Sequence, residues 1–145
     1  MTAQSLPAWL YTDERFFKIE REKIFRQAWH IVGHVNEAPN PGDYLTLDIL
    51  GERVVSVRGE DGQVRTFHNV CRHRAGKIAT EARGQCGARL VCPYHAWSYK
   101  LDGSFVSAPK WQGFEGLDAK TLGLKPVDQD IAYGFIVLSL EQGLP

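Results

Sequence analysis

The sequence predicts a mainly β fold in which short antiparallel strands follow a single helix. Three observations support this prediction. Apolar residues recur at every second position in several short stretches, and Asp-Gly pairs, which favour two-residue hairpin turns, stand between such stretches. The length of 145 residues, with a 43% content of hydrophobic residues, suits one folded domain with its own core.

The helix is expected over residues 11–29. Thr12 is the candidate N-cap, and Tyr11 and Phe16 have the spacing of a hydrophobic staple around it. Asp13 suits the positive end of the helix dipole. One face of this helix carries the apolar residues Phe17, Ile24, Phe25 and Ala28. We expect this face to pack against the rest of the protein.

Two stretches after the helix alternate as half-buried strands do. In the first, Leu45, Leu47 and Ile49 stand at every second position, and in the second Val55 and Val57 do the same. Each stretch therefore predicts one strand of an antiparallel sheet.

Turn signals place the remaining strands. Asp-Gly at 61–62 separates RVVSVR from QVRTFHNV, and Asp-Gly at 102–103 separates WSYKL from SFVS, so each pair marks a hairpin. The apolar run at 131–140 has the length of one long strand, and the Gly- and Pro-punctuated segment 107–129 reads as a loop.

Composition limits the partners and the compartment. The 17 Lys and Arg residues balance the 17 Asp and Glu residues, so no global charge favours nucleic acid or an anionic membrane. No apolar run has the length of a membrane span, and the N-terminal MTAQSLPAWL has no secretory-signal pattern. Three cysteines, two of them beside histidines, favour a metal in a reducing compartment over a disulfide framework. We therefore expect a cytoplasmic protein with neither nucleic acid nor membrane among its partners.

Two short motifs hold the residues of greatest chemical interest, Cys71-x-His73 and Cys92-x2-His95. A zinc finger groups Cys with Cys and His with His, whereas here each motif supplies one thiolate and one imidazole. That pattern suits a binuclear site in which each motif sends its Cys to one metal and its His to the other. A structural Cys2His2 zinc site is the alternative.

A [2Fe–2S] cluster held by these four side chains has a simple charge balance. Two ferric ions carry six positive charges, which the two sulfides and two thiolates cancel, so the oxidised site with neutral imidazoles is uncharged. Four thiolates would make it doubly negative; replacing two of them by His raises the potential from about −400 mV into a range of roughly −150 to +300 mV. This balance predicts an electron-transfer site.

At these motifs the sequence resembles the Rieske non-haem iron ring-hydroxylating oxygenases. The second loop, C-P-Y-H-A-W, is similar to that family's C-P-Y-H-G-W, and YTDERFFKIEREKIFRQAWHIVGHV resembles the opening of its large (α) subunits. AYGFIVLSL resembles the strand that closes its Rieske domain. The resemblance covers essentially the whole chain and implies a Rieske-type antiparallel β-sandwich or barrel. We accordingly expect an N-terminal helix and lead-in at 1–40 and a Rieske domain at 41–145, with a two-loop cluster-binding subdomain at about 66–108 and no catalytic domain.

The resemblance also implies the cofactor and its ligands. In a Rieske [2Fe–2S] cluster, Cys71 and Cys92 would bind the inner iron, and His73 and His95 the outer iron through their Nδ1 atoms. The residues expected to surround these ligands are Arg74, Gly76, Tyr94 and Trp97.

The motifs also depart from related patterns. Ala75 and Ala96 stand where Gly is common in the family, which puts loop detail in question without removing a ligand. Rieske proteins of the respiratory bc type carry an extra Cys in each loop, joined as a disulfide, but here Gly76 and Tyr94 occupy those positions and that brace cannot form. Trp97 replaces a Ser that bonds a sulfide in the bc class. We therefore expect a potential in the low part of the Rieske range.

The function implied by the resemblance is electron relay. A reductase or ferredoxin would supply electrons, and a mononuclear iron in the catalytic domain of the same or a neighbouring α subunit would receive them. We assign no catalytic residue in this chain, because the family's two-His, one-carboxylate iron site lies downstream and no His follows His95. The substrate stays open between aromatic compounds and quaternary amines, as does the choice between mono- and dioxygenase. The alternative is a free-standing Rieske-type ferredoxin, although the leading helix favours the oxygenase.

Other candidate residues are read as structural or surface groups. His30 and His34 lie four residues apart on a predicted strand, about 13 Å, which is too far for one metal. His68 and Cys86 are also read as structural. The basic residues near the first motif are Arg72, Arg74, Lys77 and Arg83. They form either a solvated surface or a docking patch for an acidic electron donor.

Overall fold

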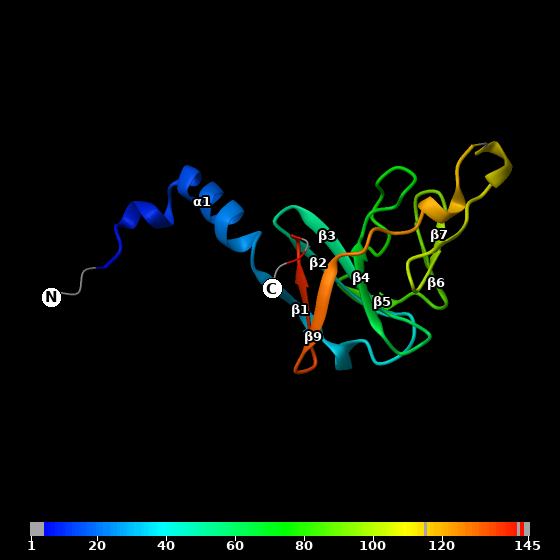
Figure 1. Cartoon of the computed structure of the whole chain (residues 1–145), viewed down its shortest axis with the longest axis horizontal. Coiled ribbons are helices and arrows are strands. Elements are labelled where there is room, and N and C mark those ends of the chain that lie inside the picture. Colours follow the sequence, from blue (N-terminus) through cyan, green and yellow to red (C-terminus); the bar gives the residue numbers. More distant parts are fainter. Residues whose placement is uncertain (1–4, 115, 142, 144–145) are drawn as a thin grey trace.

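A helical arm and three small antiparallel sheets make up the protein (Figure 1), for which a computed structural model describes residues 5–114, 116–141 and 143. The strands are β1 (Trp29–His34), β2 (Asp43–Ile49), β3 (Glu52–Arg58), β4 (Val64–His68), β5 (Arg83–Gln85), β6 (Arg89–Val91), β7 (Ser98–Lys100), β8 (Phe105–Ser107), β9 (Asp128–Ala132) and β10 (Phe135–Ser139). The helical segments are η1 (Ala8–Tyr11), α1 (Glu14–Glu20), η2 (Arg21–Phe25), η3 (Val35–Glu37), η4 (Trp111–Gly113) and η5 (Ala119–Thr121). The mainly β fold with a leading helix is confirmed.

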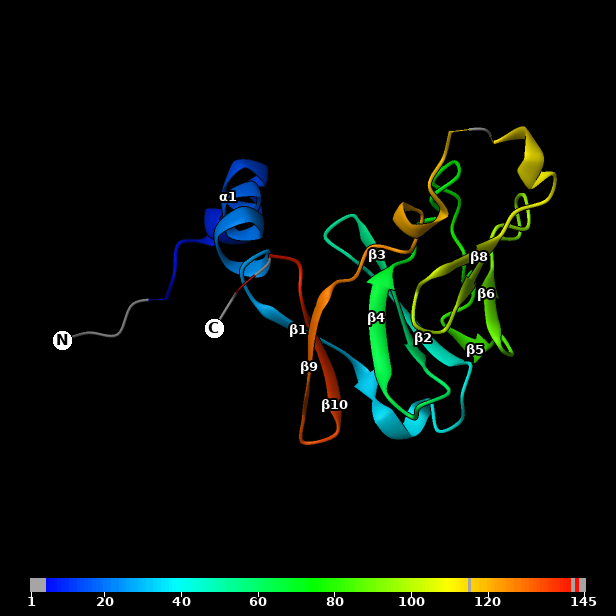
Figure 2. The ribbon, with the colours of Figure 1, turned by 45° about the vertical axis from the view of Figure 1, so that its right-hand side comes forward.

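The sheet β4-β3-β2-β5 is the middle layer, and the sheets β1-β10-β9 and β6-β7-β8 cover its two faces (Figure 2). Leu45 and Val54 face the first of these sheets, whereas Val55 faces the second. Strand β3 is therefore buried on both faces. Its alternation of apolar and polar residues predicted a half-buried strand instead. Ser56 lies fully buried within it because its hydroxyl shares a 2.7 Å hydrogen bond with Thr66.

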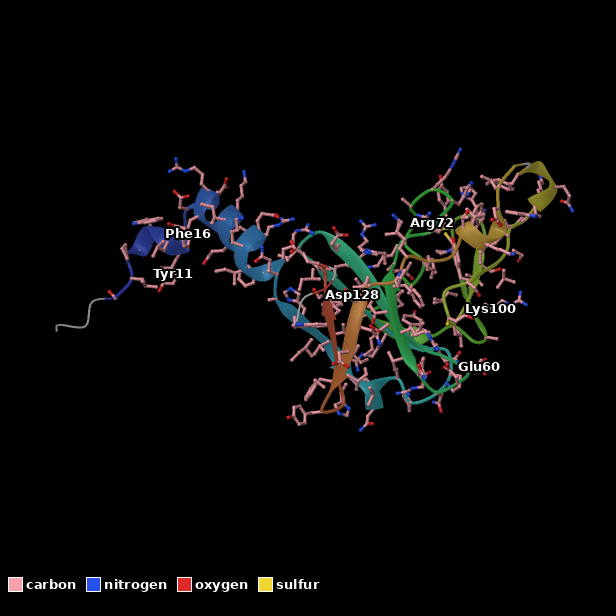
Figure 3. All side chains as sticks on the ribbon, in the orientation of Figure 1. Tyr11, Phe16, Glu60, Arg72, Lys100 and Asp128 are labelled. Carbon is pink, nitrogen blue, oxygen red and sulfur yellow. The ribbon has the colours of Figure 1, made fainter. Side chains whose placement is uncertain are left out.

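The arm is a shorter and less regular helix than the sequence predicts. The predicted N-cap, Thr12, is wrong: Asp13 caps α1, because its carboxylate accepts two backbone N–H groups at 2.8 and 2.9 Å. Phe16 then packs edge-on against Trp9, with ring centroids 5.6 Å apart, while its expected partner Tyr11 is 75% exposed (Figure 3). After α1 the chain widens into the π-helical turn η2 and enters β1 at the predicted end of the helix.

The apolar face of the arm is largely exposed. Phe17, Ile24 and Phe25 are 54%, 57% and 41% exposed, so the packing predicted for this face is not made within the described part of the chain. The arm projects from the β body (Figure 1) and is tied to it by a polar contact, in which Arg21 Nη2 donates to the carbonyl of Leu50 at 2.6 Å.

The apolar run at 131–140 forms a hairpin rather than the one long strand predicted. β9 and β10 are joined by Tyr133 and Gly134, whose φ angles of 52° and 84° fit a type I′ turn. β10 also pairs with β1, so strands from the two ends of the fold lie side by side. The hairpins predicted at 61–62 and 102–103 are confirmed, joining β3 to β4 and β7 to β8.

None of the helices in the described residues has the length and apolar character needed to cross a membrane. Residues 1–4, which belong to the stretch without a secretory-signal pattern, lie outside the described residues.

Candidate metal centre

The first and second ligand loops, residues 71–76 and 92–97, lie at the end of the β body away from the arm (Figure 2). They share one backbone pattern. In each, the N–H four residues after the Cys donates to the Cys carbonyl at 2.9 Å, and the Cys N–H donates to the carbonyl five residues on, at 2.9 and 2.8 Å. Ala75 and Ala96, each four residues after its Cys, both have a φ of 55°. That left-handed conformation favours Gly, which gives a physical reason why a Gly would suit both positions.

The four side chains predicted as ligands lie together. Cys71 and Cys92 are 3% and 2% exposed and their side chains lie close enough to interact, and the imidazoles of His73 and His95 have ring centroids 4.7 Å apart. Both imidazole Nδ1 atoms are buried, and neither has a hydrogen-bond partner among the described residues. Buried polar atoms without partners are costly, so these two nitrogens indicate a missing bonding partner.

The electrostatics of the site favour a neutral imidazole at His73. Burial is the main cause that lowers the pKa of His73, and the neighbouring His95 and Arg74 lower it further. Burial also raises the pKa of the Cys71 thiol, while the hydroxyl of Tyr99, 3.2 Å from its sulfur, acts in the opposite direction. The Tyr99 oxygen accepts the N–H of Arg72 at 3.0 Å, which leaves its own proton free to point at the sulfur.

A two-iron group fits these residues better than a single ion. Over the described residues, no three His, Cys, Asp or Glu side chains are grouped to hold one metal ion. A [2Fe–2S] cluster asks each iron for only two protein ligands, and two buried thiols with two unpartnered Nδ1 atoms supply that number.

The bases of the two ligand loops are built differently. The second grows from the paired strands β6 and β7. The first is closed by Asn69, which is fully buried: its amide donates to Ala79 O at 2.7 Å, and its Oδ1 accepts the N–H groups of Ile78 at 3.0 Å and Ala79 at 2.9 Å. Asn69 supports the first ligand loop, and the sequence does not predict this role because an Asn beside a strand carries no signal of burial.

Aromatic rings surround the imidazoles. Trp97 stacks on His73 with the ring planes 6° apart, and Tyr94 tilts over His95 with centroids 3.9 Å apart. Of the other surrounding residues predicted, Gly76 lies so near Cys92 that a Cβ on it would be 3.5 Å from the sulfur. The segment 107–129, read as a loop, contributes rings from Trp111 and Phe114 that pack against Trp97.

A basic hollow of about 540 Å³ adjoins the first ligand loop. Its charged or titratable lining consists of His68, Cys71, Arg72, His73, Arg74 and Lys125, of which Arg72 is labelled in Figure 3. Two of the basic residues expected in one patch are instead paired: Lys77 lies 3.3 Å from Asp48, and Arg83 lies 3.1 Å from Glu37. Lys125 was missed because it is some 50 residues away in sequence.

The remaining candidates have structural partners. His30 Nε2 lies 2.6 Å from Phe25 O, and His34 Nδ1 accepts the N–H of Asn36 at 3.2 Å. His68 Nδ1 is 3.7 Å from Glu52, and the Cys86 thiol donates to Gly42 O at 3.2 Å.

Comparison with known proteins agrees with this geometry. The model of the Rieske [2Fe-2S] domain family matches residues 28–121. The glycine betaine monooxygenase oxygenase subunit of Pseudomonas aeruginosa is 43% identical over 97% of this chain and 32% of its own length. The carnitine monooxygenase oxygenase subunit of Escherichia coli is 37% identical over 96% of this chain and 37% of its own.

Solved structures show the same likeness. The quaternary ammonium Rieske monooxygenase CntA with L-carnitine superposes with a TM-score of 0.89 at 34% identity, over 99% of this chain and 40% of that one. Naphthalene 1,2-dioxygenase with indole gives 0.83 at 34% identity, over 94% and 31%. The chain thus spans about a third of the length of the curated relatives it matches.

Proposed function

We propose a function from one premise: the chain belongs to the Rieske [2Fe-2S] domain family. It is an electron-transfer domain of the kind found in oxygenase subunits. It would take electrons from a reductase or ferredoxin and pass them to a mononuclear iron in a catalytic domain of the same or a neighbouring subunit. We keep the division into a lead-in at 1–40 and a Rieske domain at 41–145. The pair of buried, unpartnered Nδ1 atoms beside two buried thiols carries the proposal.

The proposed ligands are Cys71 and Cys92 for one iron, and His73 and His95, through Nδ1, for the other. When bound, a Rieske cluster takes up and gives back one electron at a time. The chain's own part is to hold two thiols in the core and two imidazoles nearer the surface. Tyr99 supports this arrangement by offering its hydroxyl proton to the Cys71 sulfur.

The first test is an EPR spectrum of the dithionite-reduced protein, with iron, sulfide and zinc analysis of the same sample. We expect two irons per chain and a rhombic signal with an average g below the free-electron value. Zinc without iron or sulfide, persisting after reconstitution with iron and sulfide, would refute the proposal in favour of a structural zinc site.

We further propose that the basic hollow receives an acidic surface of the electron donor. Arg74 and Lys125 lie on its rim and are exposed, so they can meet carboxylates without a large desolvation cost. Arg74→Glu with Lys125→Glu should slow reduction by the donor about tenfold at low salt, and the difference should shrink as ionic strength rises. The matched control is Lys18→Glu on α1, which should leave the rate unchanged; an equal loss there would refute the hollow as the docking site.

The oxygenase interpretation is favoured over a free-standing ferredoxin by the exposed apolar side chains of the arm, such as Phe17 and Ile24. A monomeric carrier gains nothing from such a surface, whereas a larger subunit can cover it.

For the whole oxygenase we propose a quaternary ammonium substrate, because the relatives named for glycine betaine and carnitine match nearly all of this chain. Oxygen uptake by the intact enzyme with glycine betaine, L-carnitine and naphthalene tests this proposal, and turnover of naphthalene alone would contradict it.

A further inference from the structure

Trp97 belongs to the second ligand loop, but its side chain stacks on His73 of the first. The indole and imidazole planes are 6° apart, and their centroids are 4.9 Å apart. Its backbone carbonyl meanwhile accepts the N–H of Cys92 at 2.8 Å, which closes its own loop. A single residue therefore touches both ligand loops.

The indole is held in place from its other sides. It is 2% exposed, and Phe105, Phe114 and Trp111 pack against it with centroid distances of 5.1, 5.5 and 6.5 Å. A tilt of the indole would have to displace these rings, which close packing makes costly. The surface that Trp97 presents to His73 is therefore stiff.

The two imidazoles differ in this respect. The ring beside His95 is that of Tyr94, which is 62% exposed and tilted by 35°. The exposed phenol ring of Tyr94 can move, and water can reach His95 beside it. His73 lies under a buried indole and His95 beside a solvated ring.

We propose that Trp97 is a positioning residue for His73, whose indole sets the plane of this imidazole and keeps water from its face. In most metal sites a hydrogen bond to the second ring nitrogen sets that plane. The inference rests on the proposed function, in which His73 binds an iron.

Removing the indole has a predictable direction. Water that reaches the imidazole stabilises the more negative, reduced form of the site. The electron-rich face that favoured the more positive, oxidised form is lost at the same time. Both effects make electron uptake easier, so the potential should rise.

The experiment compares Trp97→Leu and Trp97→Phe with the control Phe67→Leu, which removes a buried ring of β4 from the same core. The measurements are the two imidazole nitrogen hyperfine couplings of the reduced protein, its midpoint potential and its iron content. In Trp97→Leu we expect one coupling to move and the other to stay. Electron uptake should become about tenfold more favourable, which is about 59 mV for one electron. Trp97→Phe should shift the same coupling less, and the control should shift neither.

Unchanged couplings and potential in both Trp97 variants would overturn the inference. So would an equal change in Phe67→Leu, because the effect would then be one of general packing. If Trp97→Leu fails to retain iron, Trp97→Phe alone decides by the same criteria. A wild-type protein without any His-ligated signal would overturn the proposed function itself, and with it this inference.

Discussion

The two ligand loops have the same backbone and different supports. Both place an Ala in the left-handed region and close on the same pair of hydrogen bonds. The second ligand loop is held by the ladder of β6 and β7, whereas the base of the first is closed by the side chain of one buried residue, Asn69. One local geometry is thus reached by two routes, through strand pairing and through a side-chain brace. The two loops should therefore differ in what breaks them.

Their chemical surroundings differ as well. In the first ligand loop the thiol meets the Tyr99 hydroxyl and the imidazole lies under Trp97. In the second, Tyr94 exposes much of its ring beside His95. The two Cys-His motifs look equivalent in sequence, but their ligands differ in solvation. Substitutions can therefore separate the contribution of the first ligand loop from that of the second.

The largest effect should come from removing the brace of the first ligand loop. Asn69→Ala eliminates three buried hydrogen bonds and leaves backbone groups unpaired, so the free energy of unfolding should fall by about 3 kcal/mol. Denaturant unfolding measures this change. The control is Asn40→Ala, an exposed Asn bonded to Asp43, which should cost less than about 0.5 kcal/mol. A loss below about 1 kcal/mol in Asn69→Ala would show that the loop does not depend on this residue.

The next prediction compares how replacing each imidazole by a thiolate changes the midpoint potential. His73→Cys and His95→Cys each add a negative charge to the proposed cluster, so each should lower the midpoint potential by on the order of 100 mV. Redox titration of both variants checks this, with Cys86→Ser as a control outside the loops. A potential no lower than that of the wild type, with the cluster intact, would contradict the charge balance.

A smaller effect should be confined to the first ligand loop. Tyr99→Phe removes the hydroxyl 3.2 Å from the Cys71 sulfur, and a hydrogen bond to a thiolate stabilises the more negative, reduced form. Its loss should lower the potential by roughly 60 mV, equal to about 1.4 kcal/mol. Tyr44→Phe, which removes a hydroxyl from the same core, is the control and should leave the potential unchanged. Equal shifts in both variants would mean that the hydrogen bond is not the cause.

The smallest effect tests the shared backbone. Ala75→Gly and Ala96→Gly each relieve a left-handed Ala, and after the entropy cost of Gly each should raise the free energy of unfolding by about 0.5 kcal/mol. Thermal or denaturant unfolding can resolve this, with Ala38→Gly as the control, since that buried Ala has a φ of −133° and should lose stability. If one of the two loop variants gained stability and the other lost it, the two loop backbones would not be equivalent.

Sequence reasoning reached the parts of the site that depend on spacing. The two Asp-Gly hairpins are local patterns that the structure confirms. The Cys and His pairs are local patterns too, and the structure buries both Cys and places the two imidazoles with centroids 4.7 Å apart. It failed where tertiary contacts decide. Asn69 and Lys125 take their roles from neighbours that no local pattern shows.

The errors in the fold have similar causes. Tyr133 gives no turn signal, since an aromatic residue seldom adopts a positive φ, so the end of β9 and all of β10 were predicted as one strand. Thr12 and Asp13 are both good caps, and only the pair of accepted N–H groups distinguishes them. The amphipathic pattern of the arm correctly predicts helix, yet it cannot tell what covers the apolar face.

The pairing of β1 with β10 has a consequence for how the chain folds. Trp29 lies opposite Ser139, so β1 cannot find its partner until almost all the described residues have been made. At a synthesis rate of about 5–20 residues per second, that delay is on the order of 10 s. The hairpins of the other two sheets join neighbouring segments and can form earlier, because they close shorter loops. Throughout that interval an apolar strand and the arm before it stay without a sheet, which makes this the stage at which a nascent chain most needs protection from aggregation.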